Sequence, residues 1–234
     1  MLTLGIEGTA HTLGVGIIDT DRKVLANVLD MYRPAEGGLH PREAANHHGD
    51  VVASLIVKAA EEANVSLSEI ELVSFSKGPG LGPCLRTAAT AARALSCSLN
   101  VPIIGVNHCV AHVEIGRATT GCTDPALLYA SGGNTQIIAF SNGKYRIFGE
   151  TIDVGIGNML DKLGRELGLG FYAGPTIEKL ALEGDKLLNL PYSVKGMDVS
   201  FSGIMTAALS HKKKGERLED IAYSVQETVF AMFI

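Results

Sequence analysis

Two histidines, His108 and His112, stand four residues apart in a stretch that we predict to be a helix capped by Asn107. Side chains at this spacing project from one face of a helix, so both imidazoles can reach a single ion. Neutral imidazole suits zinc and ferrous iron equally. A zinc protease carries a glutamate directly after its first histidine, and Cys109 holds that position here. The pair therefore predicts a divalent-metal site without the base of a protease, although this spacing also occurs on helices that bind no metal.

The polar turn at residues 131–134, Ser-Gly-Gly-Asn, follows an apolar stretch that we predict to be a buried strand. Glycines let the backbone approach a ligand closely, and the N–H groups of such a turn can bind phosphate. We therefore predict a nucleotide-phosphate cradle at this turn, beside the metal site.

The N-terminal stretch could supply a third part of the site. Residues 2–8 and 13–19 are predicted to be apolar strands, and the turn between them follows an acid, Glu7. A turn of glycine and threonine in this place suits the approach of phosphate and metal, so Glu7, Thr9 and His11 are candidate site residues. An ordinary hairpin explains the same pattern and remains the alternative.

Glycines alternate through the loop at residues 78–83, which leads into an alanine-rich helix predicted over 84–99. The loop lacks the closing Gly-Lys-Ser/Thr of a Walker motif, so it is either a close approach of backbone to a ligand or a structural turn. One face of the helix allows another helix to pack closely, from this chain or from a partner. That face carries Ala88, Ala91, Ala92 and Leu95.

Two acids in the second half could contact a sugar. Asp161 lies on a helix predicted over residues 158–167, and Gly174 opens a further helix with Glu178 in its first turn. A solvated position explains Asp161 equally well, and an acid near a helix N-terminus is common. The basic run at residues 212–214 ends another helix, where it either compensates the helix dipole or touches a phosphate backbone.

The composition is typical of a soluble globular protein. Of the 234 residues, 46% are hydrophobic and 19% are charged, which argues against disorder. No apolar run is long enough to cross a bilayer, so we expect no membrane association. The four cysteines are far apart with no C-x-x-C pair, which favours reduced thiols in the cytoplasm. Because the formal net charge is −5, any grip on nucleic acid must come from local patches or partner subunits.

A succession of strands and then helices occurs twice along the chain. The first half has predicted strands at 2–8, 13–19 and 24–31, a helix at 41–64, a strand at 71–76, the helix at 84–99 and a buried strand at 103–106. The second has strands at 126–130, 135–140 and 145–150, followed by helices that end with one at 218–230. This duplication predicts an α/β protein of two related lobes, residues 1–122 and 123–234, with a ligand cleft between them.

Six blocks of sequence, taken in order, resemble the Kae1/Qri7/TsaD family, specifically its archaeal and eukaryotic Kae1 branch. Six separate blocks are far more specific than any one of them, and the resemblance runs from Leu4 to the last residue. The blocks are GIEGTAH from residue 5, GPGLGP from 78, GVNH from 105, SGGNTQ from 131, FGET from 148 and VKGMD from 194.

The resemblance implies an actin/Hsp70/sugar-kinase-like (ASKHA) fold and a tRNA N6-adenosine threonylcarbamoyltransferase. Such an enzyme transfers the threonylcarbamoyl group from threonylcarbamoyl-AMP to N6 of adenosine 37, next to the anticodon, in tRNAs that read codons starting with A. Members that resemble this chain act in the cytoplasm as the catalytic subunit of the KEOPS assembly, with Bud32, Cgi121 and Pcc1. The resemblance implies that Pcc1 binds the helices of the first lobe.

The resemblance also implies roles for individual residues. One divalent metal, Fe2+ or Zn2+, would be held by His108, His112 and Tyr129, with an aspartate further along the chain than residue 234. Family members continue well past that residue, so the second lobe is expected to be incomplete. A nucleotide, threonylcarbamoyl-AMP or one of the ATP/ADP type, would contact Tyr129, Ala130, Ser131, Gly132, Gly133, Asn134, Asp161, Gly174 and Glu178.

Other functions compete with this one. The histidine pair also suggests a metalloprotease of the O-sialoglycoprotein endopeptidase type, for which the glutamate base is missing. A nucleotide-gated scaffold or ATPase of the same fold would turn over nucleotide without changing the mass of tRNA. A sugar kinase is a further alternative, but no acid is recognisable as a base for a sugar hydroxyl.

Overall fold

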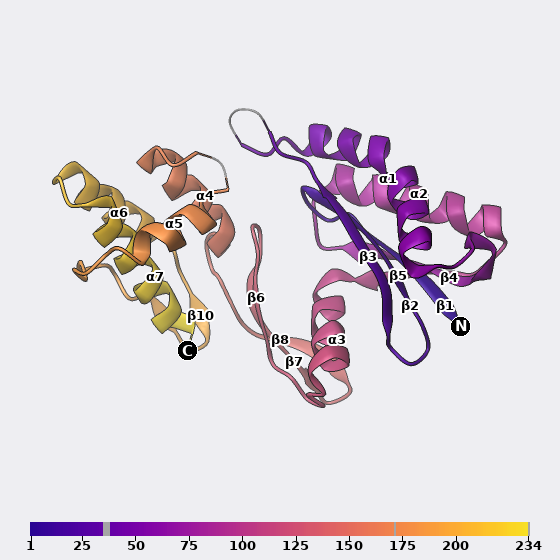
Figure 1. Cartoon of the computed structure of the whole chain (residues 1–234). Coiled ribbons are helices and arrows are strands. Elements are labelled where there is room, and N and C mark those ends of the chain that lie inside the picture. The colour runs from indigo at the N-terminus through magenta and orange to yellow at the C-terminus, as the bar shows by residue number, and fades with distance from the viewer. Residues whose placement is uncertain (35–37, 171, 234) are drawn as a thin grey trace. The chain divides into compact units, whose positions relative to one another are not determined.

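The chain divides into two units, Met1–Cys122 and Thr123–Ile234. The first unit contains a five-stranded sheet, whose strands can be followed in Figure 1. This computed structural model describes residues 1–34, 38–170 and 172–233, so residues 35–37, 171 and 234 of the predicted lobes lie outside the description. The sheet order is β3-β2-β1-β4-β5, with β1, β4 and β5 parallel and the remaining pairs antiparallel. The strands are β1 (Leu2–Glu7), β2 (Thr12–Ile18), β3 (Val24–Met31), β4 (Ile70–Gly78) and β5 (Ile103–Asn107).

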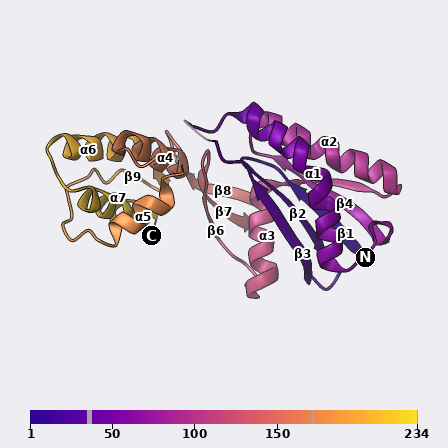
Figure 2. The same ribbon diagram turned by 45° about the horizontal axis from the view of Figure 1, so that its top comes forward.

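Two long helices, α1 (Pro41–Ala63) and α2 (Gly82–Leu99), pack side by side against this sheet (Figures 1 and 2). A third helix, α3 (His108–Thr120), follows β5, and a single 3₁₀ turn precedes β4. Proline can begin α1 because the first N–H groups of a helix have no partner inside it. Asn64 ends α1 in the left-handed conformation that an asparagine tolerates. The predicted boundaries of this helix, 41 and 64, are confirmed to within one residue.

The core of the first unit lies between the sheet and the α1–α2 pair. Leu4 and Ile6, alternate residues of β1, are at most 1% exposed and face this core, as the two-residue period of a strand requires. Ala88 and Ala92 of α2 are 0% exposed within the same core. The predicted close packing of another helix on this face is confirmed, and the helix is α1 of the same chain, so these two alanines are not available to a partner.

The predicted burial of two strands is also wrong. Strand β5 is an edge strand of the first sheet, and Ile103 and Ile104 are 38% and 51% exposed. In the second unit, strand β6 (Leu127–Ala130) is likewise an edge strand, in which Tyr129 is 6% exposed but Leu128 is 52% exposed. An apolar run fits an edge strand as well as a central one, so composition alone could not make this distinction.

The second unit combines a three-stranded antiparallel sheet, in the order β6-β7-β8, with four helices. After β6 come β7 (Thr135–Ser141), β8 (Lys144–Glu150), α4 (Ile156–Leu167), α5 (Gly174–Ala181), β9 (Val194–Lys195), β10 (Asp198–Val199), α6 (Ser202–Lys213) and α7 (Leu218–Phe233). The helices enclose a core of their own that contains Met159, Leu163 and Phe201, each 0% exposed. Among the described residues, no helix is both long enough and apolar enough to cross a membrane.

Asp153, in the loop between β8 and α4, holds the start of α6. Its carboxylate accepts hydrogen bonds from the hydroxyls of Ser200 and Ser202, both at 2.6 Å, and from the N–H groups of Phe201 and Ser202 at 3.0 and 2.9 Å. Desolvation raises the pKa of Asp153, but these hydrogen bonds to the charged form lower it more, so the pKa lies well below the ordinary value. The ionised carboxylate therefore links the start of α6 to the loop between β8 and α4.

We expect Asp153→Asn to lower the free energy of unfolding of the second unit by about 1–2 kcal/mol at pH 7. This decrease is small for a group with four hydrogen bonds because the carboxylate is exposed and solvent screens its charge. A depressed pKa in the folded state contributes stability above the ordinary aspartate pKa, about 3.9, and loses it as the pH falls toward the folded-state value. The difference between wild type and Asp153→Asn should therefore shrink below about pH 4. Urea unfolding at several pH values measures it, and an unchanged difference at low pH would contradict the assigned charge.

Candidate functional site

The carboxyl ends of β1, β4 and β5 meet at one edge of the first sheet because these strands are parallel. Ligands of open α/β sheets bind at this edge. Glu7 ends β1, and His108 directly follows the last residue of β5. The fold thus brings together two of the predicted site residues, with Glu7 Oε1 lying 3.8 Å from His108 Nε2.

Asn107 sets the start of α3 and thereby the place of the histidine pair. Its Oδ1 accepts hydrogen bonds from the N–H groups of Cys109 at 3.0 Å and Val110 at 3.2 Å, which satisfies two amides that the helix leaves unpaired. His108 is then the first residue of the helix, and His112 follows about one turn later. Their Nε2 atoms are 3.1 Å apart. The predicted cap and the predicted shared face of the two histidines are both confirmed.

The two imidazoles are hydrogen-bonded to each other through these Nε2 atoms, and the separation is also close to that of two ligands of one ion. Two nitrogens bound tetrahedrally to zinc at 2.0–2.1 Å lie about 3.3 Å from each other, and the observed separation is 3.1 Å. Desolvation lowers the pKa of His108; the nearby Glu7 opposes this change and His112 adds to it. The lowered pKa favours the neutral imidazole that metal ligation requires.

Further donors for a metal must come from beyond this pair. In the parts of the chain that the structure describes, no group of three or more His, Cys, Asp or Glu side chains is placed to hold a metal ion. Tyr129, the third predicted ligand, is a buried residue of β6 in the second unit. Its part in the site belongs to the proposal below.

Each residue of the loop at 8–11 makes a hydrogen bond through its backbone. The N–H of Gly8 donates to Ser76 Oγ at 3.3 Å, and the carbonyl of Thr9 accepts from the N–H of Leu81 at 2.7 Å. The carbonyl of Ala10 lies 2.9 Å from Nε2 of His48, a fully buried ring, and the carbonyl of His11 accepts from the N–H of Tyr32 at 2.9 Å. This β1–β2 connection is an antiparallel hairpin, as the alternative prediction held, and it also lies at the candidate site.

The alternating-glycine loop packs against that hairpin. A Cβ atom on Gly80 would lie 2.6 Å from the carbonyl oxygen of Thr9, so only glycine fits at this position without movement of the hairpin. Of the two predicted roles for the loop, the structure supports the structural one at Gly80, because its close neighbour is the backbone of Thr9.

The predicted phosphate turn is closed by its own hydrogen bonds. The N–H of Ser131 donates to the carbonyl of Asn134 at 2.8 Å, and the N–H of Asn134 donates to Ser131 Oγ at 3.1 Å. Gly132 and Gly133 between them are exposed. The turn is thus rigid at its ends and presents glycine backbone at its tip.

The first turn of α4 packs directly on this tip, a contact that sequence reasoning missed. The N–H groups of Gly157 and Asn158 donate to the carbonyls of Ser131 and Gly132 at 3.0 and 3.1 Å. A Cβ atom on Gly157 would lie 2.9 Å from the Cα atom of Gly132, so glycine is required for this approach. The Gly-Ile-Gly pattern at residues 155–157, from the N-cap into the first turn of the helix, was the feature of the sequence that could have indicated this contact. These two amides are occupied, so a phosphate would have to use those at the tip.

Asp161 of α4 contacts the residue just before α5, the helix that Gly174 begins and on which Glu178 lies. One oxygen of Asp161 accepts a hydrogen bond from the N–H of Ala173 at 3.0 Å, which places its carboxylate beside the start of α5 at Gly174. Glu178, four residues further on, lies on the same face of α5 as Gly174 and is exposed. The structure therefore brings Asp161 close to the start of α5 at Gly174, and Glu178 lies about one turn further along α5.

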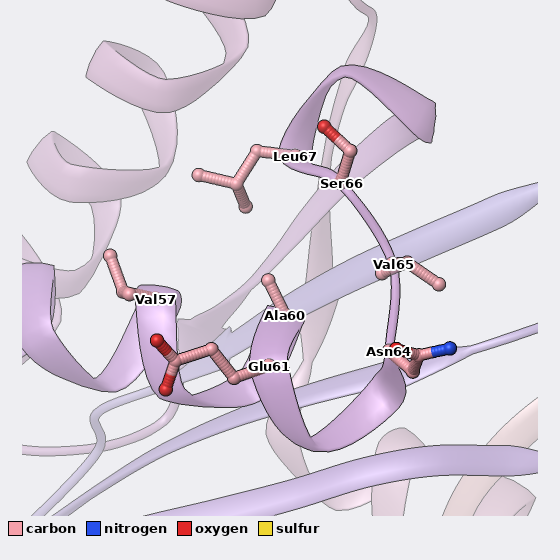
Figure 3. Close-up of a pocket in the computed structure, with 7 residues that line it drawn as sticks. All are labelled: Val57, Ala60, Glu61, Asn64, Val65, Ser66 and Leu67. Atoms are coloured by element: carbon pink, nitrogen blue, oxygen red, sulfur yellow. The ribbon is translucent and has the colours of Figure 1, made fainter.

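A separate hollow of about 500 Å³ lies in the first unit at the C-terminal end of α1 (Figure 3). It contains none of the predicted site residues, and its one charged group is the carboxylate of Glu61. Its lining consists of Val57, Ala60, Glu61, Asn64, Val65, Ser66 and Leu67. The predicted site residues therefore lie elsewhere, at the sheet edge of the first unit and at the turn and helices of the second, each considered by itself.

The fold is that of an α/β protein of the actin/Hsp70/sugar-kinase-like class, as predicted. A solved structure of HypF from T. kodakarensis matches 98% of this chain and 39% of its own chain, with a TM-score of 0.66 and 13% sequence identity. At that identity the likeness concerns the fold alone.

The chain belongs to the TsaD family, tRNA N6-adenosine threonylcarbamoyltransferase, whose family profile matches residues 23–234. It is 57% identical over 235 residues to the tRNA N6-adenosine threonylcarbamoyltransferase of Thermococcus kodakarensis, covering 100% of this chain and 72% of that protein. It is 59% identical over 234 residues to a probable bifunctional tRNA threonylcarbamoyladenosine biosynthesis protein of Methanothermobacter thermautotrophicus, of which it covers 44%. The chain thus spans less than half the length of the latter relative.

Substitution of Gly80 tests the packing of the two loops. Gly80→Ala should destabilise the first unit by about 1–3 kcal/mol, because the added methyl group meets the Thr9 backbone. A matched control is Gly49→Ala in α1, where the added Cβ has nothing within 4 Å. Loss of a helix-interior glycine should leave that variant equal to wild type or more stable by up to about 1 kcal/mol. Denaturant unfolding of both variants decides the matter, and equal stabilities would rule out the close approach.

Proposed function

We propose that this protein transfers the threonylcarbamoyl group of threonylcarbamoyl-AMP to N6 of adenosine 37 in tRNAs that read codons starting with A. The observation that carries the proposal is the 57% identity, along the whole of this chain, with a relative named tRNA N6-adenosine threonylcarbamoyltransferase. The histidine pair at 3.1 Å supports it as a feature of this chain itself.

In this proposal His108, His112 and Tyr129 hold one divalent metal, Fe2+ or Zn2+. The side chains are chemically suited to either ion, because imidazole and phenolate ligate both. When bound, the metal would act as a Lewis acid toward the carbonyl of the threonylcarbamoyl group. Asn107 keeps the two imidazoles in place by fixing the first turn of α3. Glu7, 3.8 Å from His108, lends the site a negative charge.

The nucleotide part of the substrate is assigned to the second unit. The exposed N–H groups of Gly132 and Gly133 would donate to the phosphate, within the contact segment at residues 129–134. Asp161 and Glu178, at the meeting point of α4 and α5, would accept hydrogen bonds from ribose hydroxyls, with Gly174 allowing close approach. An ATP/ADP-type nucleotide would use the same groups.

The transfer itself joins two substrates that the site holds together. The adenine N6 amine attacks the threonylcarbamoyl carbonyl, a new C–N bond forms, and the bond from that carbon to the phosphate oxygen breaks. AMP leaves, and the amine loses a proton. The contribution of the protein is orientation of the two reactants, together with hydrogen bonds from the 131–134 turn to the departing phosphate.

We further propose that the protein acts in the cytoplasm with tRNA and with the KEOPS subunits Bud32, Pcc1 and Cgi121. The formal net charge of −5 supports a need for partners in RNA binding. Pcc1 would dock on the open groove between α1 and α2, a hollow of about 540 Å³. It is lined by Arg42, Ala45, Asn46, Gly49, Val52, Pro83, Arg86, Thr87, Thr90, Ala91 and Ala94.

Replacement of one histidine tests the metal site. In the full-length protein, His108→Ala should abolish threonylcarbamoyl transfer and reduce bound Fe or Zn at least tenfold, because a single imidazole from α3 remains. Metal analysis of the purified protein and mass spectrometry of tRNA nucleosides measure both effects. His40→Ala is the control, since His40 makes no side-chain cap hydrogen bond at the start of α1. Transfer that persists after the metal is lost would refute the role of this site.

A change at the ribose contact tests the nucleotide site. Asp161→Asn keeps an oxygen that can accept the N–H of Ala173, but it removes the charge that strengthens hydrogen bonds from ribose. Affinity for threonylcarbamoyl-AMP should fall about tenfold, equivalent to about 1.4 kcal/mol. Calorimetry measures the affinity, and an unchanged unfolding midpoint shows that the α4–α5 contact survives. Wild-type affinity in this variant would exclude Asp161 from the ribose site.

A further inference from the structure

The C-terminal ends of α4 and α6 carry a group of exposed basic side chains in the second unit, which we call the basic ridge. Figure 2 shows the two helices on the same side of the unit. The ridge consists of Arg165, Lys212, Lys213 and Lys214 at these ends and of Lys162, which lies about one turn before Arg165 on α4, all of them exposed.

One hydrogen bond brings the two helix ends together. Lys212 Nζ donates to the backbone carbonyl of Glu166, in the last turn of α4. Arg165 is the neighbour of that carbonyl, and Lys213 and Lys214 are the neighbours of Lys212 in the sequence. The hydrogen bond therefore places the basic C-terminal end of α6 beside the C-terminal end of α4, which carries Arg165.

Apart from Lys212, the residues of the ridge form no salt bridge within the described residues, whereas nearby basic residues do. Lys186 pairs with Glu216 at 2.6 Å, and Arg217 lies within 4 Å of Asp185 and Glu219. No salt bridge within the described residues involves Lys162, Arg165, Lys213 or Lys214. Glu216, Asp185 and Glu219 thus pair with the neighbouring cations Lys186 and Arg217 and not with the ridge.

Compensation of the helix dipoles does not account for this much charge. The C-terminus of a helix carries about half a negative charge, so two helix ends offset about one positive charge. Glu166, the acid among these last-turn residues, offsets one more. Five basic side chains therefore leave an excess of about three positive charges, taking the dipoles into account.

We propose that the basic ridge binds the phosphate backbone of RNA. Exposed lysines spread over two helix ends suit a polyanion that extends across a surface, since each ammonium contacts a phosphate as a point charge. This inference rests on the proposed function, in which tRNA is the substrate. It implies that this chain itself contributes to the affinity for tRNA, in addition to its partner subunits. The ridge positions RNA and reads no sequence.

The test uses the full-length protein with Arg165, Lys213 and Lys214 all replaced by alanine. Lys162 and Lys212 stay, so the hydrogen bond to Glu166 is kept. A control of equal charge change replaces Lys58, Arg93 and Lys144, which are exposed and lie elsewhere. Binding of unmodified tRNA is measured by fluorescence anisotropy at several salt concentrations, and t6A formation is measured at limiting and saturating tRNA.

The loss of three phosphate contacts should reduce the slope of log affinity against log salt by about 2 to 3. Affinity for tRNA at moderate salt should fall at least tenfold, with a raised KM for tRNA and an unchanged kcat, while the control keeps the wild-type slope. An unchanged slope in the ridge variant, or an equal loss in the control, would overturn the inference. So would wild-type tRNA binding accompanied by lost binding to phosphatidylserine vesicles, which would make the ridge a membrane contact.

The same measurements separate this inference from the proposed function. If wild-type protein forms no t6A with its partners present but the ridge variant loses tRNA affinity and slope, the ridge binds RNA and the proposed reaction is wrong. If wild type forms t6A and the ridge variant binds tRNA unchanged, the reaction stands and the inference is wrong.

Discussion

The two hydrogen bonds that Asn107 Oδ1 accepts determine where the candidate metal site can be. They fix the point at which β5 stops and α3 begins, so the first helical residue is His108 and the next residue on that face is His112. A start one residue later would rotate the pair by about 100° about the helix axis, since each residue of a helix advances by that angle. The sheet edge supplies the other half of the constraint, because β1 ends with Glu7 beside the first imidazole.

Each unit contributes a different kind of group to the proposed chemistry. The first unit holds the paired imidazoles and an acid at the ends of parallel strands. The second holds the phenol of Tyr129, the glycine turn and the two acids at the α4–α5 end. In the proposed reaction, neither unit alone would have both the carbonyl-binding and the nucleotide-binding groups, so catalysis depends on both folding.

Local signals in the sequence predicted the helix boundaries well. Pro41 begins α1, Asn107 caps α3 and Gly168 ends α4, and each acts through atoms within one helical turn. The hairpins were also predictable, because Asn142 and Gly143 readily adopt the positive φ that a tight turn needs. The predicted pairing of His108 with His112 was sound for the same reason, since their spacing alone sets their distance.

Features that depend on residues far apart in the chain could not be predicted in this way. Nothing near Asp153 shows that its carboxylate will cap α6, because the partners at 200–202 lie almost fifty residues away. Gly80 meets Thr9 only after β1 and β4 pair. The exposure of Ile104 depends on which strand forms the edge of the sheet. The order of the strands cannot be deduced from an apolar run in the sequence.

The packing of α4 on the glycine turn has a mechanical consequence. Gly157 and Asn158 are hydrogen-bonded to carbonyls of the turn, and Asp161, about 6 Å further along the helix axis, is hydrogen-bonded to the residue before α5. A helix transmits displacement along its axis with little compression. The first two turns of α4 thus connect the glycine turn to the start of α5, so the two groups proposed to bind phosphate and ribose are held by one helix.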